Sequence, residues 1–141
     1  MGATESSLLK LQADLSLDAQ ALAAELAREI SGEVRFDGGS RSLYATDASN
    51  YRQVPIGVVV PHTVDDLLKT LEVCRRHNAP VLARGAGTSL CGQTCNVAGV
   101  IDTSKYLNRV LAVDPQRRRA MVEPGVVCDS LRMAAEEHGL T

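Results

Sequence analysis

The chain has 141 residues, with 15 lysines and arginines against 17 aspartates and glutamates, so its net charge is −2. This length corresponds to one ordinary domain that can bury a core, and the core must be aliphatic because the sequence has no Trp, one Phe and three Tyr. The sequence lacks the basic balance of nucleic-acid-binding proteins, the long apolar run of a membrane span and the N-terminal pattern of a secretory signal. These features predict a cytoplasmic protein that does not bind nucleic acid.

The cysteines raise the question of a metal or redox site. Cys74, Cys91, Cys95 and Cys128 occur without a secretory context, which favours a reducing compartment. Cys91 and Cys95 are close enough in sequence to act as a metal-binding or redox pair, but neither a second pair at ligand spacing nor a nearby histidine accompanies them. We therefore expect no metal site and interpret the cysteines as small side chains in a tight loop.

Residues 1–55 are predicted to form an N-terminal helical and loop leader. Residues 4–31 have helical character, and Ser16 is a suitable N-cap. After Ser16, apolar residues recur at helical spacing: Ala19, Leu22, Ala23, Leu26 and Ile30. Residues 32–55 show no strong periodicity. They include a polar loop, residues 44–51, whose two tyrosines could edge a binding site or cover the rim of the core.

A β-α-β unit is predicted next. Residues 56–61 form a short continuous apolar run, typical of a strand buried on both faces. Thr63 is a suitable N-cap for a helix that Pro80 prevents from continuing, and residues 81–83 form a second apolar strand. The pattern predicts two parallel strands with a right-handed helical crossover. The apolar helix residues that should share one face are Val64, Leu67, Leu68, Leu71 and Cys74.

The most informative stretch is the glycine loop, residues 84–93, directly after the second strand. It contains three glycines together with Thr88 and Ser89. Glycine allows a ligand to approach the main chain closely, and successive N–H groups in such a loop can converge on an anion, so we interpret the loop as a phosphate cradle. It leads into a predicted strand, residues 96–102, whereas a Rossmann loop or a P-loop leads into a helix. Its glycine spacing and its lack of a Gly-Lys-Ser/Thr sequence also match neither motif.

A hairpin and a helix are predicted towards the C-terminus. Residues 109–113 and 119–123 flank a turn with proline at its second position, which indicates a β-hairpin. The three arginines at 117–119 could form a basic patch, although a solvated hairpin end is the commoner explanation. Because no returning strand follows the last helix, we expect the chain to be a piece of something larger. That helix should end at Gly139 and present one apolar face: Cys128, Leu131, Ala134 and Ala135.

Residues 56–141 resemble the first half of the FAD-binding domain of the FAD-linked oxidases, the vanillyl-alcohol oxidase or PCMH-type superfamily. The strand ending at Pro61, the glycine loop, the strand ending at Asp102 and residues 124–126 carry the resemblance. Residues 44–47, Tyr-Ala-Thr-Asp, extend it to the branch of glycolate oxidase subunits, D-lactate dehydrogenases and D-2-hydroxyglutarate dehydrogenases, and especially to bacterial proteins that fuse the flavin module to an iron–sulfur module. The implied fold is α+β, a truncated PCMH-type FAD-binding domain in residues 56–141.

The resemblance implies a site for FAD. Residues 84–90 would wrap the pyrophosphate through backbone amides and a hydroxyl, and Pro61 and residues 124–126 would line the adenosine or flavin side. Some family members attach flavin covalently through a histidine in the loop; Thr88 stands there in this sequence, which implies non-covalent FAD. The implied FAD-binding residues are Pro61, Arg84, Gly85, Ala86, Gly87, Thr88, Ser89, Leu90, Gly92, Gln93, Pro124, Gly125 and Val126.

The implied reaction is hydride transfer from a small D-2-hydroxy acid to FAD, with an electron acceptor or a peripheral membrane as a further partner. Catalytic residues and any iron–sulfur cluster would belong to segments that this sequence does not contain, so we assign no catalytic residue and expect little activity from this chain alone. Alternatives remain open. They are a flavin reductase or synthase with a different substrate domain, a non-catalytic interaction domain of the same fold, and a thiol redox or metal module at Cys91 and Cys95.

Overall fold

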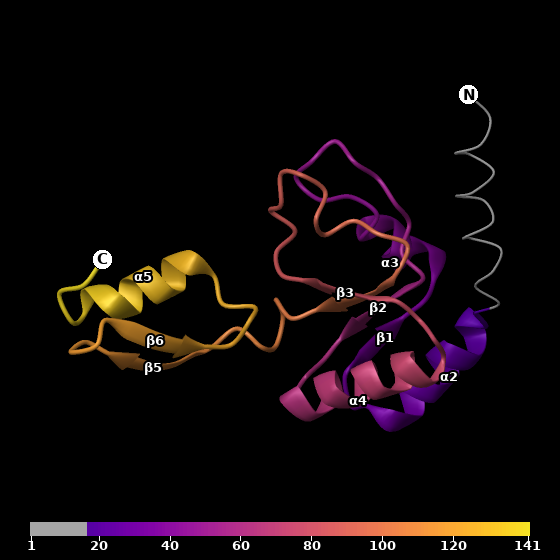
Figure 1. The fold of residues 1–141 in the computed structure, drawn as a ribbon, viewed down its shortest axis with the longest axis horizontal. Coiled ribbons are helices and arrows are strands. Elements are labelled where there is room, and N and C mark those ends of the chain that lie inside the picture. Colours follow the sequence, from indigo (N-terminus) through magenta and orange to yellow (C-terminus); the bar gives the residue numbers. More distant parts are fainter. Residues whose placement is uncertain (1–16) are drawn as a thin grey trace.

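A computed structural model describes residues 17–141, so the expected N-cap Ser16 and the helical residues predicted before it lie outside the described residues. Residues 17–108 make a first lobe and residues 109–141 a second (Figure 1). The elements of the first lobe are α2 (Ala19–Glu29), β1 (Glu33–Arg35), α3 (Gly38–Leu43), β2 (Gly57–Val60), α4 (Val64–Arg76), β3 (Val81–Arg84) and β4 (Gly99–Asp102). The elements of the second lobe are β5 (Val110–Asp114), β6 (Arg119–Val122) and α5 (Cys128–Glu136).

The first lobe is built on a four-stranded sheet with the order β1-β2-β4-β3. The two strands of the predicted β-α-β unit, β2 and β3, are both parallel to β4, which lies between them. β1 adds an antiparallel strand from residues 33–35, a stretch without a periodic signal. Because parallel strands point the same way, β2, β3 and β4 all end at one edge of the sheet, called here the carboxyl edge.

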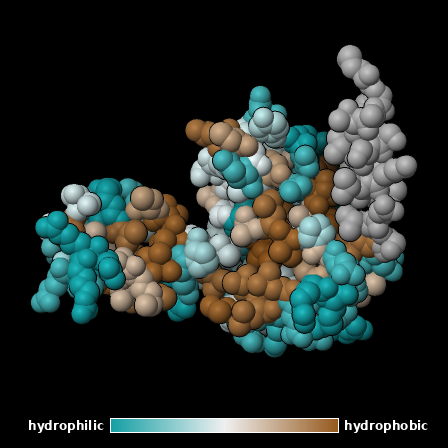
Figure 2. Space-filling view, viewed as in Figure 1, coloured by the Kyte–Doolittle hydropathy of each residue, from teal (hydrophilic) through white to brown (hydrophobic). Residues whose placement is uncertain are grey.

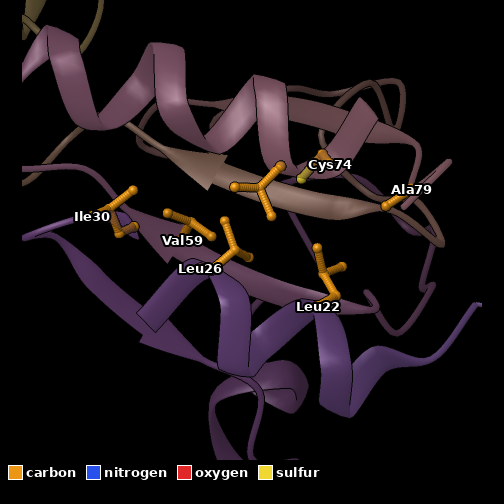
Figure 3. Packing of buried hydrophobic residues seen from close by; sticks show 7 residues of the cluster. Leu22, Leu26, Ile30, Val59, Cys74 and Ala79 are labelled. Atoms are coloured by element: carbon orange, nitrogen blue, oxygen red, sulfur yellow. The ribbon is translucent and has the colours of Figure 1, made fainter. Parts of the chain in front are cut away.

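The main core of the first lobe lies between α2, α4 and β2 (Figure 3). Asp18 caps α2 by accepting hydrogen bonds from the amides of Gln20 and Ala21. The Glu25 carboxylate then ties α2 to the end of α4 through His77 and Arg76, and these bonds, that of His77 first, hold the pKa of Glu25 below its usual value. The strand β2 is buried along its whole length, as its apolar sequence predicts. The side chains of this core are Leu22, Leu26, Ile30, Val59, Val73, Cys74 and Ala79.

The orientation of α4 differs from the sequence-based prediction. Three of the residues predicted to share the apolar face of this helix, Val64, Leu68 and Leu71, are exposed. The helix turns this way because Asp66 is fixed inward: its carboxylate completes the capping box with Thr63 and accepts hydrogen bonds from the amide and hydroxyl of Ser31. Tertiary hydrogen bonding at the helix start therefore overrides the apolar stripe. The buried residues of α4 are Asp66, Thr70, Val73 and Cys74.

The second lobe contains the predicted hairpin and helix. β5 and β6 pair antiparallel, and Arg118 in the turn between them adopts a φ of +52°. The helix α5 lies along β5, and Gly139, with a φ of +68°, follows its end as predicted. Hydrophobic residues reach the surface of both lobes (Figure 2). Among residues 17–141, no helix has the length and apolar character of a membrane span.

Candidate functional site

The glycine loop leaves β3 at the carboxyl edge and connects it to β4, as predicted. No helix begins within residues 85–98, so the loop does not lead into a helix N-terminus. The groups that the loop itself offers to an anion are therefore its amides and hydroxyls. The loop itself contains no lysine, and Arg84 is its only arginine.

The backbone amides of the loop are available to a ligand. In the described structure, none of the N–H groups of residues 85–90 donates a hydrogen bond to a protein acceptor. The exposed hydroxyl of Thr88 also has no protein partner among the described residues, whereas that of Ser89 donates to the side chain of Gln93. Gln93 in addition accepts a hydrogen bond from the amide of Cys91 and so braces the loop. Successive unpaired amides of this kind suit a multiply charged anion such as a pyrophosphate.

The three glycines of the loop occur at positions with different backbone angles and different surroundings. Gly87 has a φ of +71°, and a Cβ there would lie 2.5 Å from the Arg84 guanidinium. Gly92 has a φ of +75°, and its Cβ would lie 2.7 Å from the ring of Tyr51. Gly85 needs neither a positive φ nor a close approach, because a Cβ there meets no protein atom within 4 Å. The bare backbone at Gly85 thus borders open space, which fits a ligand lying against the main chain.

Arg84 holds the protein rather than facing the open side of the loop. Its guanidinium donates to the backbone oxygens of Tyr44, Thr46 and Thr94 at 3.4, 2.9 and 3.1 Å. It also lies over the Tyr44 ring, 5.2 Å from its centroid. The arginine therefore joins the two ends of the glycine loop and attaches them to residues 44–46. Its guanidinium already donates hydrogen bonds to these carbonyl oxygens.

A partly buried polar pair supports the same edge. The hydroxyl of Tyr44 donates to the carboxylate of Asp102 at the end of β4, over a distance of 2.5 Å. Burial, together with this carboxylate, raises the pKa of Tyr44 to about 12. The phenol therefore stays protonated as a donor. Of the two roles the sequence left open for the tyrosines at 44–51, Tyr44 covers the rim of the core, because it packs against the buried cluster of Val58, Val60 and Val100.

The other residues implied by the resemblance lie in different environments. Pro61, at the carboxyl end of β2, is fully buried, whereas Pro124 is exposed and Val126 is half-buried. Gly125 is buried, and the space beside it is closed: a Cβ there would lie 2.1 Å from the oxygen of Thr103. Ala86 and Leu90 are exposed on the loop. In the first lobe, the implied FAD-binding residues that are exposed therefore lie on the glycine loop, whereas Pro61 is buried.

The cysteines and histidines do not gather at this site. Cys91 is exposed and Cys95 is buried, and all four cysteines have free thiols. His62 stacks edge-on against Tyr106, with ring centroids 4.2 Å apart, and His77 pairs with Glu25. Within residues 17–141, no group of three or more His, Cys, Asp or Glu side chains is arranged to hold a metal ion.

Sequence reasoning missed one residue of this site, Asp47. Its carboxylate accepts hydrogen bonds from the amide and hydroxyl of Thr94 at 3.3 and 3.0 Å, directly after the glycine loop. It accepts two more from Ser49. The Asp-x-Ser spacing is a usable signal for a local turn, but it does not reveal the distant partner.

With this geometry in view, comparison with known proteins identifies the family. Residues 55–141 match the family model described as "FAD binding domain". The chain belongs to this family. The predicted superfamily and the predicted α+β fold are thereby confirmed, and FAD is the cofactor. The unpaired amides at 85–90 and the open space beside Gly85 fit the pyrophosphate of FAD.

Two individual relatives show which members of the family the chain is similar to. The chain is 34% identical over 116 residues to glycolate oxidase subunit GlcD of Bacillus subtilis, covering 79% of this chain and 25% of the relative. It is 31% identical over 112 residues to D-2-hydroxyglutarate dehydrogenase of Pseudomonas putida, covering 77% of this chain and 11% of the relative. The chain therefore spans a quarter or less of the length of these relatives.

Solved structures agree on the fold. An alkyldihydroxyacetonephosphate synthase superposes with a TM-score of 0.71 at 18% identity, over 85% of this chain and 25% of that protein. A p-cresol methylhydroxylase superposes with a TM-score of 0.66 at 17% identity, over 86% of this chain and 25% of that protein. At this level of identity the likeness concerns the architecture, which is that of PCMH-type FAD-binding domains.

Proposed function

We propose that this chain forms the pyrophosphate-binding side of a non-covalent FAD site in an oxidoreductase that acts on a D-2-hydroxy acid. The observation that carries the proposal is the run of unpaired amides at residues 85–90, next to the bare backbone of Gly85 and the free hydroxyl of Thr88. Thr88, rather than a histidine, stands at the position of covalent attachment in the resemblance, which supports a flavin held by non-covalent contacts.

Within such a site, each residue of this chain has a binding or orienting task. Loop amides and the Thr88 hydroxyl bind the pyrophosphate by donating hydrogen bonds, since Arg84 is committed to backbone oxygens. Gln93 keeps the outer half of the loop in place through its contacts with Ser89 and Cys91. FAD, when bound, supplies the hydride acceptor of the reaction.

The substrate class is supported by the relatives. These relatives are named glycolate oxidase subunit, D-2-hydroxyglutarate dehydrogenase and D-lactate dehydrogenase, and the acids in these names are all 2-hydroxy acids. The substrate-binding groups and the base that accepts the hydroxyl proton would lie in another domain of the enzyme. We propose a cytoplasmic enzyme whose reduced flavin passes its electrons to a separate acceptor. Bleaching of the flavin by D- but not L-2-hydroxy acids, in a polypeptide carrying both domains, tests the substrate.

The cofactor site is tested by titrating the chain with FAD while following flavin fluorescence. Gly85→Ala places a methyl group where the cofactor should lie, and we expect its Kd to rise by about tenfold, the effect of a poorly tolerated extra methyl group. Gly38→Ala is a matched control, because a Cβ at Gly38 also meets no atom within 4 Å and lies outside the loop. A folded wild-type chain without saturable FAD binding, or equal affinities for Gly85→Ala and wild type, would overturn the proposal.

A further inference from the structure

One segment of the first lobe, residues 44–52, packs along the whole glycine loop although it precedes it by some forty residues. At the start of the loop, Arg84 binds backbone oxygens of the segment. In the middle, the amide of Ala48 donates to the oxygen of Gly87 at 3.0 Å. Near the end, the ring of Tyr51 lies against Gly92. The segment thus contacts the loop at three separate points.

The carboxylate of Asp47 adds the contact that closes the loop. One oxygen accepts from the amide and hydroxyl of Ser49, within the segment itself. The other accepts from the amide and hydroxyl of Thr94, directly after the loop. The pKa of Asp47 lies well below its usual value, chiefly because of the Ser49 hydroxyl and with a contribution from Thr94, so the group is a carboxylate at any physiological pH.

Thr94 is therefore held from two sides. Asp47 binds its amide and hydroxyl, while Arg84 binds its backbone oxygen at 3.1 Å. Since Arg84 begins the loop and Thr94 follows it, these contacts fix both ends of the loop against the same segment.

The loop needs this support because its own residues provide little. The amides of residues 85–90 make no hydrogen bond within the described structure, and within that run only the Gly87 oxygen and the Ser89 hydroxyl bond to other described residues. A glycine-rich run that is not held at its ends populates many conformations, and ordering it would then reduce the free energy available for binding. Holding the ends in advance removes that cost.

We propose that Asp47 is a positioning residue for FAD, which clamps Thr94 so that the glycine loop is held with its amides directed at the pyrophosphate. This inference rests on the proposed function. It goes beyond the family match, because Asp47 and the rest of residues 44–52 lie outside the matched residues 55–141. The segment is thus a working part of the cofactor site, and the site is assembled from both sides of residue 55.

Substituting both partners of the clamp tests the proposal by FAD titration. Asp47→Asn and Thr94→Val should each raise the Kd for FAD about tenfold, as expected if one loop in ten remains in the competent conformation. Thr94→Ser keeps the hydroxyl and should bind FAD as the wild type does. If packing of the Thr94 methyl group were what mattered, Thr94→Ser would weaken binding instead. Asp37→Asn is the matched control, because Asp37 accepts an amide hydrogen bond from Ser40 at the start of α3, outside the loop. Wild-type affinity in both Asp47→Asn and Thr94→Val would overturn the clamp.

Amide hydrogen exchange on the FAD-free chain decides the same question without the cofactor. In Asp47→Asn, we expect at least about tenfold faster exchange at Ala48 and Cys95, whose amides donate to loop oxygens and not to Asp47. The amides of Val100 and Ile101 in β4 serve as internal controls for the fold. Unchanged exchange at Ala48 and Cys95 would show that Asp47 does not hold the loop. If the wild type failed to bind FAD while exchange changed as expected, the proposed function would fall and the clamp would stand.

Discussion

The two lobes use similar elements but differ in how completely they bury their apolar side chains. The buried apolar core residues, from Leu22 to Leu107, all belong to the first lobe. In the second lobe, α5 has no buried residue, and several large apolar side chains are exposed: Leu111, Met121, Val127 and Met133. An amphipathic pattern thus suffices to form a hairpin and a helix, whereas a closed core needs a second layer over the sheet.

The second lobe is fixed mainly at its base. There Glu123 accepts hydrogen bonds from the amide and guanidinium of Arg109, and Gly125 donates to the oxygen of Leu107. Farther out, a cavity of about 640 Å³ opens between the hairpin and α5, with Val113, Leu131 and Ala135 in its lining. The first lobe should therefore determine the stability of the chain, and the second should respond locally.

The largest expected effect is on the core of the first lobe. Leu26 is fully buried between α2, α4 and β2, so Leu26→Ala should lower the free energy of unfolding by about 2–5 kcal/mol. Leu131→Ala, on the half-buried face of α5, makes the same chemical change and should cost less than about 1 kcal/mol. Urea denaturation followed by circular dichroism measures both. Equal losses would show that the lobes share one core.

The next largest effect should come from the junction of the lobes. A Cβ at Gly125 would lie 2.1 Å from the oxygen of Thr103 and 2.8 Å from that of Leu107, and neither backbone atom can move freely. Gly125→Ala should therefore cost roughly 1–3 kcal/mol and loosen the second lobe. Amide exchange in α5 should accelerate while β2 keeps its protection. Retained protection in α5 would mean that other contacts hold the second lobe.

A smaller difference should be visible in the wild type. Amides of β2 and β4 are paired inside a buried sheet, whereas those of β5, β6 and α5 lie in a lobe without buried apolar side chains. Native-state hydrogen exchange should show at least about tenfold weaker protection in the second lobe, because it opens without unfolding the core. Similar protection throughout would contradict the contrast between the lobes.

Local signals predicted the fold well, and distant contacts account for what they missed. The N-cap at Thr63, the hairpin turn and the stop at Gly139 depend on neighbouring residues, and all three are confirmed. The strand β1 is too short to show an alternation, and its place in the sheet depends on pairing with β2. The apolar stripe of α4 gave the wrong buried face, because the inward anchoring of Asp66 depends on Ser31, 35 residues away.

The candidate site shows the same limit. The sequence predicted a phosphate cradle in the glycine loop, because glycine spacing and hydroxyl residues are local features. It could not assign Arg84 to backbone oxygens, or distinguish glycines that the fold requires, such as Gly87, from Gly85, which borders open space. Nor could it connect Asp47 to Thr94, which are 47 residues apart and meet only when both loops pack together.

The smallest predicted effect concerns a surface contact of the first lobe and its dependence on pH. Glu33 accepts hydrogen bonds from Lys105 at 2.6 Å and Tyr106 at 2.7 Å, and also pairs with Arg35. The Lys105 contact, followed by the Tyr106 and Arg35 contacts, lowers the pKa of Glu33 from 4.5 to about 2. Because the folded-state pKa lies below the unfolded value, this carboxylate stabilises the fold above pH 4.5, and the contribution is lost as the pH falls towards 2.

Glu33→Gln should therefore lower the free energy of unfolding by at most about 1 kcal/mol at neutral pH, because the contact is partly exposed and screened by solvent. The difference from wild type should shrink as the pH falls below 4.5. Glu137→Gln, in the second lobe, is the control, since the Glu137 side chain makes no hydrogen bond within the described residues. Denaturation curves over this pH range measure both variants. A constant difference for Glu33→Gln would mean that packing at this position, rather than the charge of Glu33, ties β1 to the segment after β4.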